Sequence, residues 1–402
     1  MTRLICSLVL VSLVLSEAHA QVGIGDSNLR GVSAISDTIV WISGSKGVIA
    51  RTLNGGRSWE RLPAPQGAEN YDFRDIEAYS ADVAFLMSAG PGNQSRIWKT
   101  TDGGKTWHQQ YANPAQEFFL DSLACWRDTQ QQSGNQQCVA LSDPVPDPHD
   151  NNTPKFLVLM TDDGEHWREL PRDHMPPALI EKHAATTPQR DQQPAATQQQ
   201  GTQQQQSADQ DLREGAFAAS GTAITVLGSN IWFGTGGPHA RVFHSADRGQ
   251  TWSVADTPLM HGEASQGIFS IAFRDAKHGV IVGGDYRQPT KTGANLAFTS
   301  DGGKSWTLAR PARPNSHGGA GSNINDLPYC SAVAYSTTPD RIDAAGLEGL
   351  YHIIGEGRSA EVYRTGEKRS FNAMSSNWLV GPSGSVLQRA EPAAPSLHHP
   401  GK

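Results

Sequence analysis

A short phrase that recurs five times constrains the fold of this chain more than any other feature. Each copy has a small hydroxyl residue, Asp or Asn two positions later, then Gly, and Trp at its end. The copies occupy residues 52–59, 100–107, 160–167, 245–252 and 299–306. Their tryptophans stand 48 to 85 residues apart. A phrase that returns at such a period indicates one supersecondary unit copied around a solenoid or a propeller.

The phrase has the chemistry of a hairpin turn. The Asp or Asn side chain accepts hydrogen bonds from backbone N–H groups that follow it, and Gly supplies a positive φ. Strand-like residues precede each copy, and the Trp opens the next strand by burying its ring against the neighbouring unit. Two copies depart from the pattern, because Asn54 replaces the Asp and Met160 stands at the hydroxyl position.

The residues between the copies predict four short strands in each unit. The first unit shows them at 29–35, 38–43, 47–52 and 58–62. Later units begin near Tyr71, Phe118, Glu214, Gly267 and Tyr329, and a seventh unit at 377–389 lacks its last strand. We therefore predict an all-β fold, a seven-bladed β-propeller of four-stranded antiparallel blades.

The closure of the ring is predicted from the two ends of the chain. Residues 22–25 form a strand-sized segment, and we expect it to supply the outermost strand of blade seven, because closure removes an open sheet edge. In the sixth unit we interpret residues 364–371 as a decayed copy of the phrase, with Phe371 in the Trp position.

The N-terminus has the features of a secretory signal peptide over residues 1–20: Arg3, an apolar run at 4–15 and the small-residue pattern of 18–20. The run is too short to span a membrane, so we expect an exported protein in the periplasm or outside the cell. The propeller should cover 21–390. Within it the Gln-rich segment 172–212, and after it the tail 391–402, are expected to be disordered, because they cannot bury enough apolar area.

The third unit carries a further insertion, expected between its middle strands and running from Gln130 to Asp147. Cys125 and Cys138 flank the first part of it, which predicts a hairpin disulfide in an oxidising compartment. Cys330 is then either a buried thiol or a partner of one of the other two.

The composition and the remaining motifs narrow the function. A net charge of −7 offers no basic surface for nucleic acid. The histidines lack zinc-ligand spacing, so no metal site is predicted. The Gly-rich segments 234–237 and 318–321 have no helix pattern beside them, and no cofactor is predicted.

Polar residues on the inner strands, or just after the middle strands, are the candidates for a binding site, because ligands of propellers bind where loops meet at the mouth of the central channel. These candidates are Arg30, Arg74, Asp75, Asp121, Asp143, Glu214 and Asp285. Arginines and carboxylates on one rim could hold a sugar or an anionic group. Alternatively, they pair with one another across the blades.

The recurring phrase is similar to the Asp-box, or bacterial neuraminidase repeat, which implies an outer turn of a propeller blade without a catalytic role. Further phrases lie at 29–33, 95–107, 142–145, 231–237, 267–275 and 283–286. Together they resemble the photosystem II stability and assembly factor family, whose bacterial members are often labelled oxidoreductases. The resemblance covers nearly all of the chain after residue 20 except the Gln-rich segment and the tail, and it implies a non-enzymatic scaffold.

Two functions are left. The first is an exported, monomeric, non-enzymatic propeller that binds a protein or carbohydrate partner in the cell envelope. The alternative is a glycoside hydrolase, sialidase-like or of another kind, with carboxylates at the channel mouth. Sialidases carry an Arg-Ile-Pro phrase near the N-terminus, and the nearest match in this chain, at Arg74, lacks the Ile-Pro.

Overall fold

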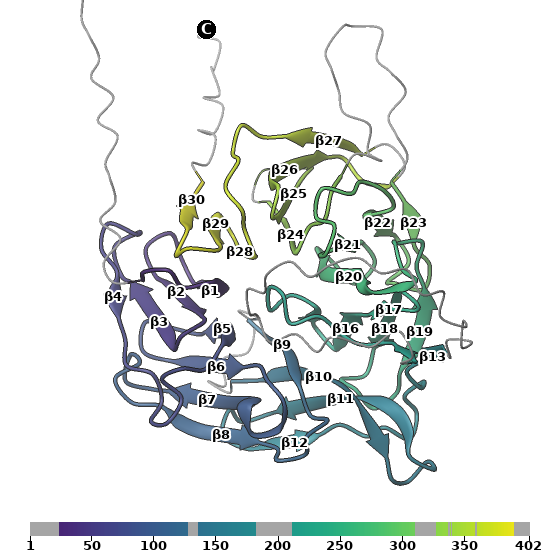
Figure 1. Ribbon diagram of the computed structural model, residues 1–402, viewed down its shortest axis with the longest axis horizontal. Coiled ribbons are helices and arrows are strands. Elements are labelled where there is room, and N and C mark those ends of the chain that lie inside the picture. The colour runs from purple at the N-terminus through teal and green to yellow at the C-terminus, as the bar shows by residue number, and fades with distance from the viewer. Residues whose placement is uncertain are drawn as a thin grey trace, which may run out of the picture.

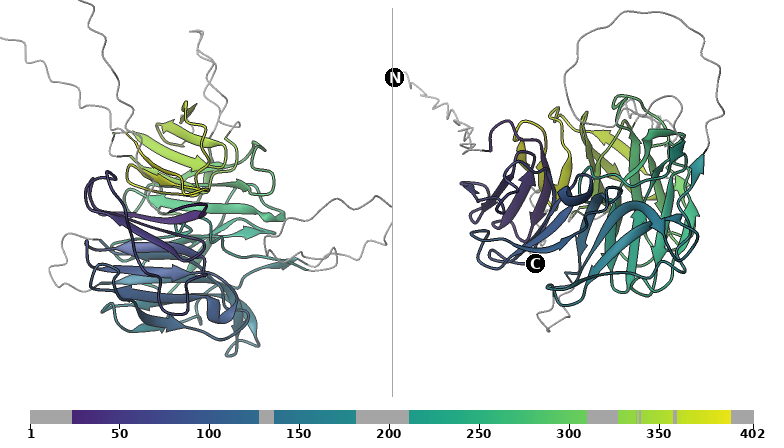
Figure 2. Two further views of the ribbon diagram at one scale, coloured as in Figure 1. Left: turned by 60° about the vertical axis from the view of Figure 1, so that its left-hand side comes forward. Right: turned by 60° about the horizontal axis from the view of Figure 1, so that its bottom comes forward.

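The computed structural model describes residues 24–127, 136–181, 211–309 and 327–389, apart from positions 337, 339, 358 and 359. In this part of the chain seven antiparallel sheets stand in a ring as blades (Figure 1), which confirms the predicted β-propeller. Views turned by 60° show the sheets packed face to face around the ring (Figure 2). The predicted signal peptide 1–20 and tail 391–402 lie outside the described residues.

The first three blades follow one another along the chain, each with its innermost strand first. Blade 1 contains β1 (Leu29–Ala34), β2 (Val40–Gly44), β3 (Val48–Thr52) and β4 (Glu60–Arg61). Blade 2 contains β5 (Phe73–Ala78), β6 (Ala84–Ser88), the 3-10 helix η1 (Gly92–Gln94), β7 (Arg96–Thr100) and β8 (His108–Ala112). Blade 3 contains β9 (Leu120–Cys125), β10 (Cys138–Asp147), β11 (Thr153–Thr161) and β12 (Trp167–Glu169).

The other blades complete the ring. Blade 4 contains β15 (Ile224–Leu227), β16 (Asn230–Gly234), β18 (Arg241–Ser245) and β19 (Ser253–Asp256). Blade 5 contains β20 (Glu263–Phe273), β21 (Gly279–Asp285), β22 (Leu296–Thr299) and β23 (Thr307–Leu308), with β17 (Gly236–Gly237) paired to β20. Blade 6 contains β24 (Ala332–Tyr335), β25 (Arg341–Gly346), β26 (Gly349–Ile354) and β27 (Glu361–Arg364). Blade 7 contains β28 (Ala373–Ser375), β29 (Trp378–Val380) and β30 (Val386–Gln388).

The recurring phrase joins the third and fourth strands of blades 1 to 5, as the sequence predicts. In the second copy the hydroxyl of Thr100 accepts a hydrogen bond from the Gly104 N–H at 2.9 Å, and Asp102 accepts one from the Thr106 N–H at 2.9 Å. In the third copy the hydroxyl position lies one residue later than the sequence analysis places it. There Thr161, not Met160, supplies the hydroxyl to the Gly164 N–H.

In blades 1, 2 and 5 a glycine of this turn packs against a tryptophan of the blade before it. A Cβ on Gly104 of blade 2 would stand 3.2 Å from Trp41 of blade 1. A Cβ on Gly56 of blade 1 would stand 2.6 Å from Trp378 of blade 7, and Gly56 also has a φ of +77°. The same contact that joins consecutive blades therefore closes the ring.

The N-terminal residues close the ring by packing rather than as the predicted strand, as far as the structure describes them. Ile24 and Gly25 belong to no strand, and residues 22 and 23 lie outside the described ranges. The Ile24 side chain is 1% exposed and lies in one apolar cluster with Trp378. The Gly384 N–H donates to the Ser27 carbonyl at 2.7 Å, and blade 7 has three strands in the described part of the chain.

Three other expectations about the units are wrong. Residues 364–371 follow β27, the fourth strand of blade 6, so they connect two blades and are no decayed copy of the turn. The insertion of blade 3 lies between β9 and β10, its first two strands, and Asp143 belongs to β10 itself, next to a register shift. Residues 214–220 are no inner strand of blade 4, since β15 takes that place.

The boundaries predicted for the Gln-rich segment are too wide. Within 172–212, the residues up to 181 are described and include β13 (Ile180–Glu181), which pairs with β14 (Leu212–Arg213). Met175 is 3% exposed in the core cluster between blades 3 and 4, so apolar burial holds this part in place. Residues 182–210 lie outside the described ranges.

Small polar side chains connect the inner strands across every junction between blades. Each either accepts a hydrogen bond from, or donates one to, the neighbouring inner strand. The contacts are Ser33–Ala78 N, Asp75–Leu123 N, Ser122–Ile224 N, Thr222–Ser270, Ser270–Val333 N, Ser331–Asn372 O and Ser375–Ala34 N. These contacts form a polar ring around the channel.

The contact of Gly56 with Trp378 can be tested against Gly67, which has a φ of +78° and nothing within 4 Å of a built Cβ. Both Gly→Ala variants incur the backbone cost of a positive φ, whereas only Gly56→Ala meets the ring of Trp378. We expect Gly56→Ala to lower the free energy of unfolding by about 1–3 kcal/mol more than Gly67→Ala in urea titrations. Equal losses would show that the closing contact contributes nothing.

Candidate binding site at the channel mouth

Two arginines stand together where the inner strands begin. Arg30 is the second residue of β1 and Arg74 the second residue of β5, so both lie at the same end of the channel. Asp72, just before β5, lies between them: its Oδ2 is 2.8 Å from the Nε of Arg74 and 3.9 Å from the Nε of Arg30. We call this end, defined by Arg30, Asp72 and Arg74, the arginine mouth.

The charges of the arginine mouth do not balance. The side chains of Arg30, Arg74 and Asp72 are 23%, 26% and 28% exposed, so all three are held partly out of water. Burial, followed by the charge of Arg74, lowers the pKa of Arg30 from its ordinary value. Two guanidinium groups therefore share one carboxylate.

Two further carboxyl groups, Asp121 and Asp143, lie close to each other, and Asp121 is near enough to Arg74 for its pKa to be affected. Asp121 is 1% exposed, and burial, followed by the charge of Asp143, raises its pKa well above the ordinary range, against the opposing effect of Arg74. Burial raises the pKa of Asp143 to about 6, although its Oδ1 accepts a hydrogen bond from the Ala216 N–H at 3.0 Å. Burial thus disfavours the charged form of Asp121, which weakens its capacity to offset the charge of Arg74.

Residues 215–222, which lead into β15, reach across the channel and are called the plug. The Ala218 carbonyl accepts a hydrogen bond from Arg74 of blade 2 at 3.1 Å, and the Gly221 carbonyl accepts one from Ser122 of blade 3. Thr222 contacts Ser270 of blade 5 through their hydroxyls at 2.6 Å. The plug is therefore fastened to three blades besides its own.

The plug needs glycine where it passes over blade 2. Gly221 has a φ of +73°, and a Cβ there would stand 2.4 Å from the carboxyl group of Asp75. Asp75 itself accepts hydrogen bonds from the N–H groups of Ile76 and Leu123, and burial, followed by the charge of Glu77, raises its pKa well above the ordinary range. Asp75 is accordingly a part of the polar ring.

Aromatic rings line the mouth beside the arginines. Phe217 of the plug stacks on Phe269 of blade 5 with ring centroids 3.9 Å apart, and Tyr286 meets both rings edge-on. Tyr329 contacts Phe269 edge-on at 4.8 Å and lies close enough to Arg30 to affect its pKa. The mouth thus combines two positively charged side chains with a neighbouring cluster of aromatic rings.

Glu214 and Asp285, the other candidates from the sequence, hold partners of their own. Glu214 is fully buried in an ion pair with Arg241 and also accepts hydrogen bonds from Thr235 and from the Leu179 N–H. It fastens the chain around β13 and β14 to blade 4.

Asp285 is 1% exposed and accepts hydrogen bonds from Gln266, Gln288 and the Arg287 N–H. Burial alone would raise its pKa, but hydrogen bonds from Ser265, Gln266 and the Arg287 N–H, together with the charge of Lys291, lower it. It therefore stabilises the turn that follows β21.

Sequence reasoning missed Asp72, the plug and the aromatic wall. Asp72 stands two positions before Arg74, and that spacing was a signal that the pair could share a hydrogen bond. Phe217 fell within a predicted strand. Tyr329 was placed only as the start of the sixth unit, because its nearness to Arg30 depends on the closure of the ring.

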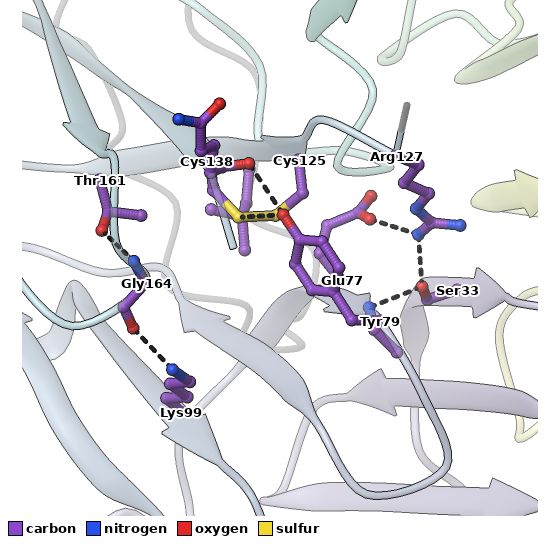
Figure 3. Close-up of a disulfide and its surroundings, with 12 residues drawn as sticks. Ser33, Glu77, Tyr79, Lys99, Cys125, Arg127, Cys138, Thr161 and Gly164 are labelled. Atoms are coloured by element: carbon purple, nitrogen blue, oxygen red, sulfur yellow. Dashed lines mark hydrogen bonds and ion pairs between the residues drawn. A yellow bond between two sulfur atoms is a disulfide. The ribbon is translucent and has the colours of Figure 1, made fainter. Parts of the chain in front are cut away.

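The predicted disulfide is present. Cys125 and Cys138 lie opposite each other in β9 and β10 and are joined by an S–S bond (Figure 3), and Cys330 is a buried free thiol. Among the described residues no group of three or more His, Cys, Asp or Glu side chains could hold a metal ion. The same residues contain no helix with the length and apolar character needed to cross a membrane.

No protein-family model and no curated protein matches the chain. The solved structures that are similar to it include two of YCF48. One is described as YCF48 bound to D1 peptide, is 13% identical, and aligns with a TM-score of 0.35 over 85% of this chain and 94% of its own. The other, YCF48 from Cyanidioschyzon merolae, is 13% identical, with a TM-score of 0.34 over 86% of this chain and 96% of its own. The fold assignment therefore rests on the sheet topology described above.

The raised pKa of Asp143 predicts how stability depends on pH. A carboxyl group whose pKa rises to about 6 on folding stabilises the fold fully below its ordinary pKa, and this contribution is lost as the pH rises through 6. In urea titrations, the free energy of unfolding of the wild type should therefore rise relative to that of Asp143→Asn as the pH falls from about 7 to about 5. The exposed Asp82→Asn variant controls for a changed charge. Parallel profiles for wild type and Asp143→Asn would contradict the assignment.

Proposed function

We propose that this protein is a non-catalytic scaffold that binds a protein partner at the arginine mouth, through an acidic group of that partner. The observation that carries the proposal is the sharing of Asp72 by Arg30 and Arg74, each about one quarter exposed. A partner carboxylate would supply the missing negative charge.

The chemistry of the mouth favours such a ligand. Guanidinium groups present planar donor pairs that match a carboxylate, and charge-assisted hydrogen bonds are about twice as strong as neutral ones. Partial burial reduces screening by salt, so the interaction exceeds that of a surface ion pair. The rings of Phe217 and Tyr286 add apolar contact of the kind that dominates protein interfaces.

The sequence supports the same kind of function. The phrases that resemble the photosystem II stability and assembly factors imply a scaffold without chemistry. The signal peptide predicted at 1–20 supports export. We therefore infer a partner in the cell envelope. We also propose that the protein is a monomer. A carbohydrate with an acidic group is the second kind of partner that we propose for the same site.

One observation favours the alternative, a glycoside hydrolase. Asp121 and Asp143 are neighbouring carboxyl groups with raised pKa values, as a general acid requires. However, Asp121 is 1% exposed, so substrate has little access to it. Glu214 and Asp285 are committed to Arg241 and to the turn after β21. The scaffold is therefore the preferred function.

An acidic peptide tests the proposal. We expect a fluorescein-labelled eight-residue Glu-rich peptide to bind the wild type, and Arg30→Gln and Arg74→Gln each to weaken binding about tenfold or more, because each removes a partly buried charge from the site. Fluorescence anisotropy measures this, with the exposed Arg57→Gln as the charge-matched control and a Gln-rich peptide as the ligand control.

The outcomes separate the two functions. Equal binding by Arg57→Gln and Arg74→Gln variants would reject the mouth as the site. Hydrolysis of chromogenic glycosides that is lost in Asp121→Asn or Asp143→Asn would replace the scaffold with the hydrolase.

A further inference from the structure

A cavity of about 360 Å³ lies at the end of the channel opposite the arginine mouth. Its lining comes from the last residues of the inner strands, among them Glu77 of β5, Cys125 of β9 and Ser375 of β28. Gly221 and Thr222 of the plug also line it. The plug thus lies between this lower cavity and the mouth, and the two are separate places.

One side of the lower cavity is charged. Arg127, two residues after β9, forms an ion pair with Glu77 of blade 2. It also donates to the Ser33 hydroxyl at 2.7 Å (Figure 3) and to the Ala34 carbonyl at 3.3 Å, both in blade 1. Arg127 therefore spans from blade 3 to blade 1, and its side chain keeps 38% exposure.

The opposite side is apolar. Blades 5, 6 and 7 contribute Ile271, Phe273, Val333, Tyr335 and Met374 to the lining. A cavity with a cation on one side and apolar side chains on the other matches an amphiphile that has an anionic head and an apolar tail. Its volume lies near the lower end of the range for small-molecule sites, about 300–1,000 Å³, so the ligand is small.

The disulfide fixes the charged wall. Cys125, which lines the cavity, is bonded to Cys138 in the next strand, and Arg127 follows two positions later. The Tyr79 hydroxyl donates to the Gln137 carbonyl at 2.9 Å and holds the other side of the same loop to blade 2. The guanidinium of Arg127 is thus preorganised, which reduces the entropy lost when it binds an acceptor.

We propose that the lower cavity binds a small amphiphile with a carboxylate head, its head on Arg127 and its apolar tail along the wall of blades 5 to 7. Arg127 is the one cation among the lining residues that the structure describes. A guanidinium has more N–H donors than the three contacts above use, so a carboxylate can bind without displacing Glu77. This site is independent of the acidic peptide at the mouth.

Decanoate and 1-decanol, which share a chain and differ in the head, test the proposal with the full-length oxidised protein. In isothermal titration we expect one decanoate per chain, with 1-decanol weaker by about tenfold or more because it lacks the charge-assisted hydrogen bond. Arg127→Gln should weaken decanoate by a similar factor and leave 1-decanol unchanged. Arg127→Lys, which keeps the charge without the fork, should lie between them.

Arg57→Gln is the matched control, because it removes an exposed arginine outside the lining of the lower cavity and should leave decanoate binding intact. Thermal melts of each variant show whether the fold is retained. If Arg127→Gln fails to fold, the difference in affinity between decanoate and 1-decanol for the wild type still shows whether the carboxylate head contributes to binding. Equal binding of decanoate and 1-decanol, no binding of decanoate, or a loss of decanoate binding in Arg57→Gln that equals the loss in Arg127→Gln would overturn the proposal.

Discussion

The polar ring around the channel is the constraint on which the rest of the structure depends. Innermost strands leave one edge without a partner strand, and unpaired backbone groups there are costly to bury and invite wrong pairing. A neighbouring inner strand cannot supply a ladder, because the blades diverge from the axis. Short side chains supply the bonds instead: Ser33 accepts from blade 2 and Asp75 from blade 3. Because these side chains are short, each bond fixes the height of one inner strand relative to its neighbour.

This alignment of the inner strands explains why the two ends of the channel are distinct places. Residues near the starts of β1 and β5 meet at the arginine mouth, and residues near the ends of the same strands meet at the lower cavity. The plug is attached to the same ring, since Ser122 and Ser270 each hold both a neighbouring inner strand and the plug. A change in the plug would therefore reach both ends through the ring.

Local chemistry made the outer part of the fold predictable, and long-range contact made the inner part unpredictable. The turns could be predicted because Thr100 and Asp102 bond to residues within the same phrase, and the disulfide because Cys125 and Cys138 flank one loop. The plug was interpreted as a strand, because its fastening to Arg74 and Ser122 involves residues far away in sequence. Arg30 and Arg74 are predicted as site residues from the sequence. Their sharing of Asp72 could not be predicted, because it depends on the angle between blades 1 and 2.

The buried carboxyl groups decide what the two ends can bind. Asp75 and Asp121 have raised pKa values, so burial works against the negative charge that would neutralise nearby arginines. At the mouth Asp72 is shared by two guanidinium groups, an imbalance that favours an acidic partner. At the lower cavity Glu77 forms an ion pair with Arg127, so a ligand there meets a neutralised pair of charges together with the apolar side chains of blades 5 to 7. One set of strands thus presents a site with unbalanced charge at one end and a cavity with a charged and an apolar side at the other.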